Sequence, residues 1–267
     1  MNRNIVKTIA ILFMVMTVFS CRKKDNDPMA GSDSKCPLLS VSGIKGSIRE
    51  YEWVASRLIR VYSKDSIPTT LLFRYNTKNL PEKMEIQTGT STSKYIITFL
   101  YDDKNKVVMT KTSLSGVEFM HNDFLYNSEN NIASITTSVE LFGKKVSGKT
   151  RIEYNGDNVS KVYSSIDNDQ ESLAFWGEKY DDKKQFCPEV YKYAAMGFVG
   201  IANNFFSFFG ENNMLEGRIY DGKGRVDQKT TISYLYNKDG LPTKSETTME
   251  RNNKISSETN SYIFACK

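Results

Sequence analysis

The stretch YDGKGRV, Tyr220 to Val226, decides the fold because it is one copy of a repeated segment. Every copy opens on a tyrosine that is followed by Asp or Asn. The tyrosines that open the seven copies are Tyr75, Tyr101, Tyr126, Tyr154, Tyr180, Tyr220 and Tyr236. The first five are 26, 25, 28 and 26 residues apart, and 56 residues, two steps of 28, separate Tyr180 from Tyr236. Periods of this size are typical of a repeat architecture.

Each copy has the composition of a strand, a turn and a second strand. The Asp or Asn after the tyrosine can bond the nearby backbone, and a following Gly or Asn tolerates a left-handed conformation. In five of the seven copies the residue two positions before the tyrosine is apolar, which places both on one face of a strand. Strands joined by tight turns are antiparallel. We therefore expect a mainly all-β fold, a long antiparallel meander of about a dozen strands that forms a highly curved sheet or incomplete barrel.

The repeat pattern is interrupted between Tyr180 and Tyr220. The segment CPEVYKYAAMGFVGIANNFFSFFG, residues 187–210, has no alternation of apolar and polar residues. Its Pro-Glu start and its final glycine are typical helix boundaries, so we expect a helical insert that covers the inner face of the sheet. The alternative is a helix that dips into a membrane or binds a partner. Its polar residues argue against a full membrane span.

The N-terminal residues have the pattern of a secretory signal. Arg3 and Lys7 precede an uncharged apolar run over residues 8–19, which predicts a signal peptide over residues 1–20. The sequence VFSC, ending at Cys21, resembles a bacterial lipobox, whose cysteine is acylated and becomes the mature N-terminus. We expect an acyl anchor at Cys21; the alternative is an ordinary cleaved signal with a cysteine nearby.

The residues after Cys21 predict a tether and then the β-repeat domain. Residues 21–35 carry few apolar side chains, so we expect a flexible spacer, with the domain over residues 36–267. In the sorting pattern that this leader resembles, an aspartate directly after the lipidated cysteine directs a lipoprotein to the inner membrane. This chain has Arg22 at that position. This favours an outer-membrane lipoprotein, whose domain faces either the cell surface or the periplasm. Asp25 and Asp27 also resemble the export tag of Bacteroides-type surface lipoproteins.

The cysteine count is odd once Cys21 is acylated, because Cys36, Cys187 and Cys266 remain. Cys36 opens the domain and Cys266 nearly ends it. A disulfide between them would close a loop of about 230 residues and contribute about 5 kcal/mol in the chain-entropy description. The alternative is three free buried thiols.

The repeats resemble a known sequence family. YDGKGRV, and YNKDGLPTKSETT from Tyr236, are similar to the tyrosine–aspartate repeats of Rhs proteins. With the lipobox and the chain length, they resemble uncharacterised Bacteroides-type lipoproteins that are described as having a porin-like β fold. The resemblance covers about residues 70–265. It implies that fold and brings no activity with it.

The residue inventory excludes several kinds of chemistry. His121 is the only histidine, so multi-histidine metal sites are excluded, and we expect it on the surface near a strand end. YDGKGRV lacks the Gly-Lys-Ser/Thr ending of a phosphate-binding loop. The 36 basic and 31 acidic residues are interspersed, without the basic stripe that nucleic-acid binding requires. We therefore expect no cofactor, no metal and no nucleic-acid partner.

Carboxylates are the enzymatic groups that remain. YDDK occurs at Asp102/Asp103 and at Asp181/Asp182. Neighbours on a strand point to opposite faces, so we expect solvated turn residues rather than an acid–base pair. A glycan hydrolase that uses two carboxylates stays an alternative. The run DNDQE, Asp167–Glu171, has oxygen ligands for calcium but lacks the glycine and the length of an EF-hand loop.

The tyrosine column is the remaining candidate site. In-register repeats would align Tyr75, Tyr101, Tyr126 and Tyr154 as an aromatic ladder, which either stabilises the sheet or forms a platform for a glycan or an apolar ligand. We expect a monomeric, non-catalytic binding or scaffolding lipoprotein, with an envelope or surface protein as the other kind of partner. A purely structural envelope protein is a further alternative. We expect no pore, because the strands lack a continuous lipid-facing apolar band.

Overall fold

The computed structural model describes residues 36–43, 46–65, 67–167, 169–186, 189–198 and 203–266. The expected signal peptide over residues 1–20 and the expected tether over residues 21–35 lie outside these ranges, as do Cys21 and Cys187. The β-repeat domain expected from residue 36 onward is the part described below.

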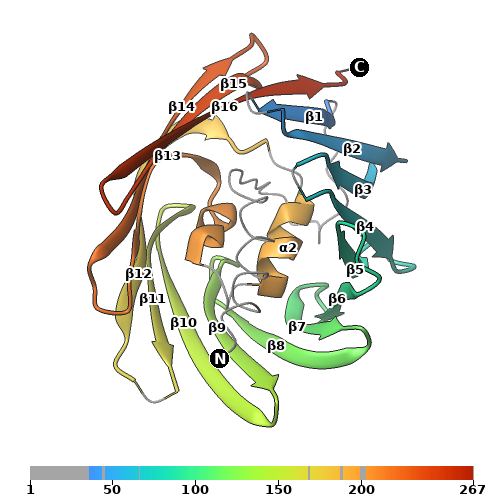
Figure 1. Ribbon diagram of the computed structural model, residues 1–267, viewed down its shortest axis with the longest axis vertical. Helices are drawn as coiled ribbons and strands as arrows, with labels where there is room; N and C mark the ends of the chain where they lie inside the picture. Colours follow the sequence, from blue (N-terminus) through green and yellow to red (C-terminus); the bar gives the residue numbers. More distant parts are fainter. Residues whose placement is uncertain are drawn as a thin grey trace.

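Sixteen antiparallel strands form one closed barrel (Figure 1). In chain order they are β1 (Leu38–Gly43), β2 (Ile48–Val54), β3 (Arg57–Ser63), β4 (Thr69–Tyr75), β5 (Pro81–Thr88), β6 (Lys94–Tyr101), β7 (Val107–Leu114), β8 (Val117–Tyr126), β9 (Ile132–Leu141), β10 (Lys144–Asn155), β11 (Asn158–Ile166), β12 (Ser172–Lys184), β13 (Asn212–Tyr220), β14 (Val226–Tyr236), β15 (Pro242–Arg251) and β16 (Lys254–Phe264). Every strand pairs with its neighbours in the sequence, and β1 pairs with β16.

The expected all-β meander is confirmed, but the expected curved sheet or incomplete barrel is wrong. The register from Leu38 opposite Phe264 to Gly43 opposite Asn260 closes the ring and leaves no unpaired edge. The expected number of strands, about a dozen, is also too low. The extra strands β1 to β3 precede the first tyrosine repeat, and their hairpin turns at Ala55 and Ser56 without the tyrosine motif.

Alternation along each strand separates an apolar interior from a polar exterior. In β4, the side chains of Thr69, Leu71 and Phe73 are buried inside the barrel, whereas Leu72 and Arg74 are exposed. In β5, Met84 and Ile86 are completely buried. The period of two matches the pleat, so β1 to β12 and β16 each contribute buried apolar side chains to one core. The buried side chains Ser245 and Thr247 of β15 are polar.

Five of the tyrosine repeats make the same turn. The Asp or Asn after the tyrosine accepts hydrogen bonds from the backbone N–H groups two and four residues later. The fourth residue after the tyrosine has positive φ and is Asn or Gly in each case. The side chains that hold these turns are Asn76, Asp102, Asn127, Asp221 and Asn237. The turn chemistry expected from the sequence is therefore present.

The two ends of the barrel differ. The turns after Tyr75, Tyr101, Tyr126, Tyr154 and Tyr236 all lie at one end, which we call the tyrosine end. Strand β13 runs antiparallel to β12, so the turn after Tyr220 lies at the opposite end, which we call the far end. The YDGKGRV copy is therefore out of phase with the others. This explains why Tyr220 falls inside a step of 56 residues.

The insert between β12 and β13 lies inside the ring of strands (Figure 1). It contains helix α2 (Glu189–Phe198) and the 3₁₀ helix η1 (Asn203–Phe209). α2 contacts β7 and β8, and η1 contacts β11, β12 and β13. Phe198, Phe206 and Tyr193 are almost completely buried. A ring of sixteen strands is wide enough for a channel, and here helices fill the part that side chains cannot.

Polar groups on the barrel wall fix the carboxyl end of α2. The Asn122 side-chain amide donates to the Met196 carbonyl at 3.0 Å, and Thr112 donates to the Gly197 carbonyl at 3.1 Å. These are carbonyls that a helix end leaves without intrahelical partners. Gly197 allows this approach, because a Cβ there would lie 2.2 Å from Cδ1 of Ile97.

Candidate functional site

The repeat tyrosines form hydrogen bonds that tie each hairpin to the preceding one. The hydroxyl of Tyr101 donates to the Pro81 carbonyl at 2.6 Å, and that of Tyr126 donates to the Val107 carbonyl at 2.8 Å. The same bond joins Tyr75 to Leu58, Tyr154 to Ile132 and Tyr180 to Val159. We call this contact the tyrosine clasp. Each clasp joins a tyrosine to the chain close after the preceding hairpin turn.

The expected platform residues therefore lie at one level of the inner wall but do not stack on one another. Tyr75, Tyr101, Tyr126 and Tyr154 belong to β4, β6, β8 and β10, with one further strand between each pair. Neighbouring strands are about 4.8 Å apart, which separates successive rings by roughly 10 Å. Burial raises the pKa of Tyr101 and Tyr126 well above the ordinary 10.0, so both hydroxyls stay protonated and can donate the clasp hydrogen bonds. Their geometry favours a role in holding the wall together.

Replacing Tyr126 with Phe should lower the free energy of unfolding by about 1–2 kcal/mol, because the Val107 carbonyl loses its side-chain donor while the ring stays. Urea unfolding followed by circular dichroism measures the change. Tyr62 to Phe is the matched control, because Tyr62 lies on β3 outside the clasps and should tolerate the loss of its hydroxyl. Equal stability of Tyr126→Phe and the wild type would contradict the clasp.

The two Asp-Asp pairs have structural positions rather than a shared acid–base geometry. Asp102 caps its turn by accepting from the backbone N–H groups of Lys104 and Lys106, and Asp103 is exposed. Asp182 is exposed too, and its carboxylate pairs with Lys183 at 3.1 Å. Within each Asp-Asp pair, the two carboxylates therefore do not face a common site.

Asp181 differs from the expected solvated turn residue. β12 continues through Lys184, so this copy of the motif makes no turn, and the carboxylate of Asp181 accepts a hydrogen bond from Tyr236. The Asn213 side chain, which is 2% exposed, donates to both Tyr236 and Asp181. The expectation of a turn at Asp181 is wrong. The three groups link β12, β13 and β14 at the mouth of the tyrosine end.

His121 and the acidic run at Asp167 are also used locally. His121 lies in the middle of β8 rather than near a strand end, and its ring nitrogens lie 3.8 Å from Glu118 and 3.9 Å from Asp123. Asp167 accepts from the Ser147 backbone, and Glu171 pairs with Arg151 at 2.9 Å. Within the described ranges, no group of three or more His, Cys, Asp or Glu side chains could hold a metal ion.

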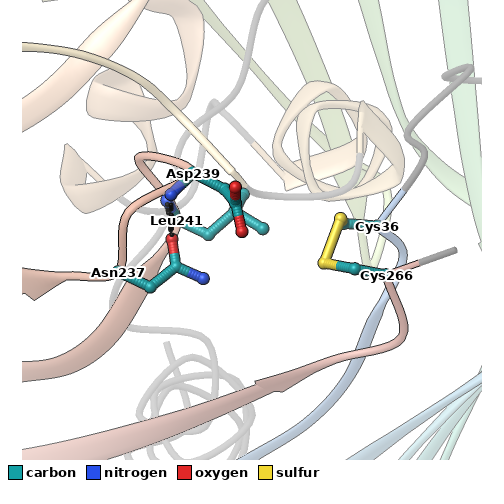
Figure 2. Close-up of a disulfide and its surroundings, with 5 residues drawn as sticks. All are labelled: Cys36, Asn237, Asp239, Leu241 and Cys266. Atoms are coloured by element: carbon teal, nitrogen blue, oxygen red, sulfur yellow. Dashed lines mark hydrogen bonds between the residues drawn. A yellow bond between two sulfur atoms is a disulfide. The ribbon is translucent and has the colours of Figure 1, made fainter.

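Cys36 and Cys266 form a disulfide at the tyrosine end. It lies just outside the pairing of β1 with β16, so it joins the two strands whose contact closes the barrel. Figure 2 shows it together with the turn that Asn237 holds, where the side-chain oxygen of Asn237 accepts from the backbone of Asp239 and Leu241.

A cavity of about 330 Å³ opens at the far end, and sequence reasoning missed it. β9, β10, β11 and β12 form its wall, and the turn after Tyr220 borders it. Its lining residues are Thr137, Val139, Val146, Ser147, Gly148, Lys149, Thr150, Ser164, Ser165, Ile166, Ser172, Leu173, Ala174, Tyr220, Asp221 and Gly222. An alignment of the repeats could have indicated this cavity, because the residue six positions before the tyrosine is small in two copies, Gly148 and Ala174.

The outer wall of the barrel carries ion pairs between neighbouring strands. Glu85 on β5 pairs with Arg74 on β4 at 2.8 Å and with Lys94 on β6 at 3.3 Å. Further cross-strand pairs on the wall are Glu52–Arg60, Lys111–Glu118 and Glu178–Arg218. Exposed apolar side chains such as Leu125 and Val117 lie near strand ends, and Leu72 lies in the middle of β4.

The barrel has a counterpart among solved structures. It resembles a porin-like protein. A crystal structure of a porin-like protein from Bacteroides uniformis matches with a TM-score of 0.54 at 16% identity, over 86% of this chain and 96% of that chain. Another porin-like protein, from Bacteroides vulgatus, matches with a TM-score of 0.49 at 13% identity, over 84% of this chain and 97% of that one. At this identity the first likeness shows the fold alone, and it agrees with the porin-like fold that the repeats implied.

No protein-family model matches the chain, and no curated protein matches it in sequence. In the described segments, no helix has the length and apolar character that crossing a membrane requires.

Proposed function

We propose that the chain is a non-catalytic binding or scaffolding lipoprotein of the bacterial outer membrane, whose barrel stands in water and is held to the membrane by an acyl group on Cys21. The observation that carries this proposal is the reversed polarity of the wall. A membrane-spanning barrel has an outward apolar band and a polar lumen. Here, a cluster of buried apolar side chains and two helices lie in the interior, beside a smaller set of buried polar residues such as Asn122, and cross-strand ion pairs lie on the exterior.

The cost of placing this wall in a bilayer supports the proposal. A lysine or arginine that faces lipid near the bilayer midplane costs about 2–4 kcal/mol. Arg60, Arg74 and Lys111 are each at least 45% exposed on the outer wall. Since such costs accumulate around the barrel, the folded state is far more stable in water than in hydrocarbon.

The closed architecture supports an envelope role without catalysis. The likeness to a porin-like protein from Bacteroides fits a barrel of a bacterial envelope. The paired aspartates that a hydrolase would need are used in turn caps, ion pairs and a strand-linking cluster. We therefore favour retention of a ligand or a partner over its turnover.

The position of the anchor gives the barrel an orientation. Cys36, the first described residue, lies at the tyrosine end, and the 14 residues 22–35 lie between it and Cys21. A flexible chain of that length has an end-to-end distance of roughly 20 Å. The tyrosine end would then face the membrane, and the far end with its cavity would point away from it.

Replacing Cys21 with Ala should move the protein from the membrane fraction to the soluble fraction, folded and without detergent. Alkaline carbonate extraction of membranes, followed by immunoblotting and circular dichroism of the released protein, measures this. Cys187 to Ala is the matched control, because it also removes one cysteine but should leave the protein on the membrane. A Cys21→Ala protein that resists carbonate extraction would contradict both the anchor and the water-exposed wall.

A further inference from the structure

We propose that the far-end cavity binds a small neutral saccharide. This inference names a site and a ligand class for the binding role proposed above, and it does not depend on the acyl anchor. The volume of about 330 Å³ lies at the lower end of the range for small-ligand pockets. A ligand of about one or two sugar rings fits this size better than a long polymer does.

The cavity lies where the residue six positions before the tyrosine becomes small. Gly148 is in register with β11, whereas Ala174 lies at a β-bulge of β12. Six residues before the tyrosine, the earlier repeats carry Thr69, Tyr95 and Met120, whereas the later ones carry Gly148 and Ala174. Both small residues line the cavity. Gly148 therefore leaves open the interior space that a side chain fills in the neighbouring hairpins.

The same hairpins become polar at the next inward-facing position. Four residues before the tyrosine, Leu71 and Ile97 give way first to Asn122 and then to Thr150, and the residue opposite Thr150 on β11 is Ser164. Both line the cavity, and Thr150 is only 6% exposed. Within the described part of the chain, the hydroxyls of Thr150 and Ser164 have no hydrogen-bond partner in the protein. Thr150 is buried and Ser164 is half-buried, and their hydroxyls favour a ligand that brings donors and acceptors.

The charges around the cavity favour a neutral ligand. Asp221 borders the cavity, but Arg225 neutralises its carboxylate with bonds of 2.8 and 2.9 Å. Lys149 lines the rim and its side chain is exposed. A charged ligand inside would therefore lose water without gaining a buried counter-ion, which is unfavourable.

The remaining lining favours a sugar over a purely polar solute. Val139, Ile166 and Leu173 contribute apolar surface next to the hydroxyls. A sugar ring has polar edges and apolar C–H faces, so it can hydrogen-bond to the hydroxyls and pack against the apolar side chains. A hydrocarbon ligand would leave the hydroxyls of Thr150 and Ser164 unpaired.

The test is saturation-transfer NMR on the full chain, purified from membranes in lauryldimethylamine oxide because sugar-headed detergents would compete. The probes are glucose, galactose, N-acetylglucosamine, maltose, cellobiose, lactose and diacetylchitobiose, with glucuronate and decanoate as charged and apolar probes. We expect saturation transfer to at least one neutral sugar, and weaker or no transfer to glucuronate and decanoate. Calorimetry then gives the Kd of the sugar that binds.

Variants assign the site. Thr150→Val and Ser164→Ala should each raise the Kd by about 3–10-fold, the loss expected for one hydrogen bond. Gly148→Leu should abolish binding by filling the cavity, since a Cβ there meets only the Ser165 carbonyl oxygen, at 3.4 Å. Thr136→Val, an exposed residue next to Thr137 on β9, should bind like the wild type. Circular dichroism checks that each variant is folded.

Several outcomes would overturn the inference. They are no transfer to any neutral sugar, tighter binding of glucuronate or decanoate, and unchanged sugar affinity in folded Gly148→Leu or in both Thr150→Val and Ser164→Ala. None of them depends on where the protein is found in the cell. A negative result in the Cys21→Ala extraction would remove the anchor and leave the binding data intact.

Discussion

Replacing both Cys36 and Cys266 with serine should lower the free energy of unfolding by about 3–5 kcal/mol. The disulfide joins residues 230 positions apart, so it restricts nearly the whole unfolded chain. In the folded state the bridge adds little, because the hydrogen bonds of β1 with β16 already bring these ends together. The effect therefore arises mainly in the unfolded state. Urea unfolding of the variant and of the oxidised wild type measures it.

Reduction supplies the control for this prediction. The wild type in dithiothreitol should have the same unfolding midpoint as the double variant, and dithiothreitol should not affect the variant itself. Mass mapping of the non-reduced protein should recover Cys36 linked to Cys266. A linkage of either cysteine to Cys187, or equal stabilities with and without reductant, would contradict a stabilising disulfide between Cys36 and Cys266.

Replacing Asn122 with Ala should lower the free energy of unfolding by about 3–4 kcal/mol and loosen α2 inside the barrel. Asn122 is completely buried on β8. Its amide donates to the Met196 carbonyl of α2 and to Thr110, and its oxygen accepts from Thr137 at 2.6 Å. Alanine removes all three bonds and creates a small void. Thr110 and the Met196 carbonyl keep their bond to each other, whereas the buried Thr137 hydroxyl loses its partner.

Two measurements separate loss of the helix contact from a general loss of stability. Urea unfolding gives the free energy, and limited proteolysis should cut Asn122→Ala faster within residues 187–202. His121→Ala is the matched control, since His121 is the neighbour of Asn122 but faces outward between Glu118 and Asp123. If Asn122→Ala is as resistant to protease as His121→Ala, the interior hydrogen bonds do not hold α2.

The local parts of this fold could be predicted from the sequence. The tyrosine–Asp/Asn motif predicted turns, because its side chain accepts the N–H groups of its own loop, as Asn76 does from Lys78 and Leu80. Alternation predicted the inward face, as with Phe73 and Tyr75. These features depend on contacts within a few residues, and the sequence displays such contacts directly.

Closure and the cavity depend on distant residues and were not predicted. The expected disulfide between Cys36 and Cys266 brings the two ends of the domain together, but it does not indicate that Leu38 pairs with Phe264 in a closed sheet. β1 to β3 also lack the tyrosine motif. The regular spacing of the tyrosines along the sequence predicted a ladder of stacked rings. In the structure, the second strand of each hairpin lies between neighbouring tyrosines and separates their rings. The cavity arises from small differences between repeats, which a search for their common features ignores.

The tyrosine clasp has a consequence for how such chains change over time. From β4 to β12, each unit of two strands is bonded to the unit before it through the same contact, so the junctions that carry a clasp are equivalent. Duplication or loss of about 26 residues would preserve the contact at the new junction and alter the circumference by two strands. Barrel diameter grows with strand number, so a chain that lost one unit would lack room for α2 and η1. Wall and interior must therefore evolve together, the wall in whole hairpins and the interior by substitution.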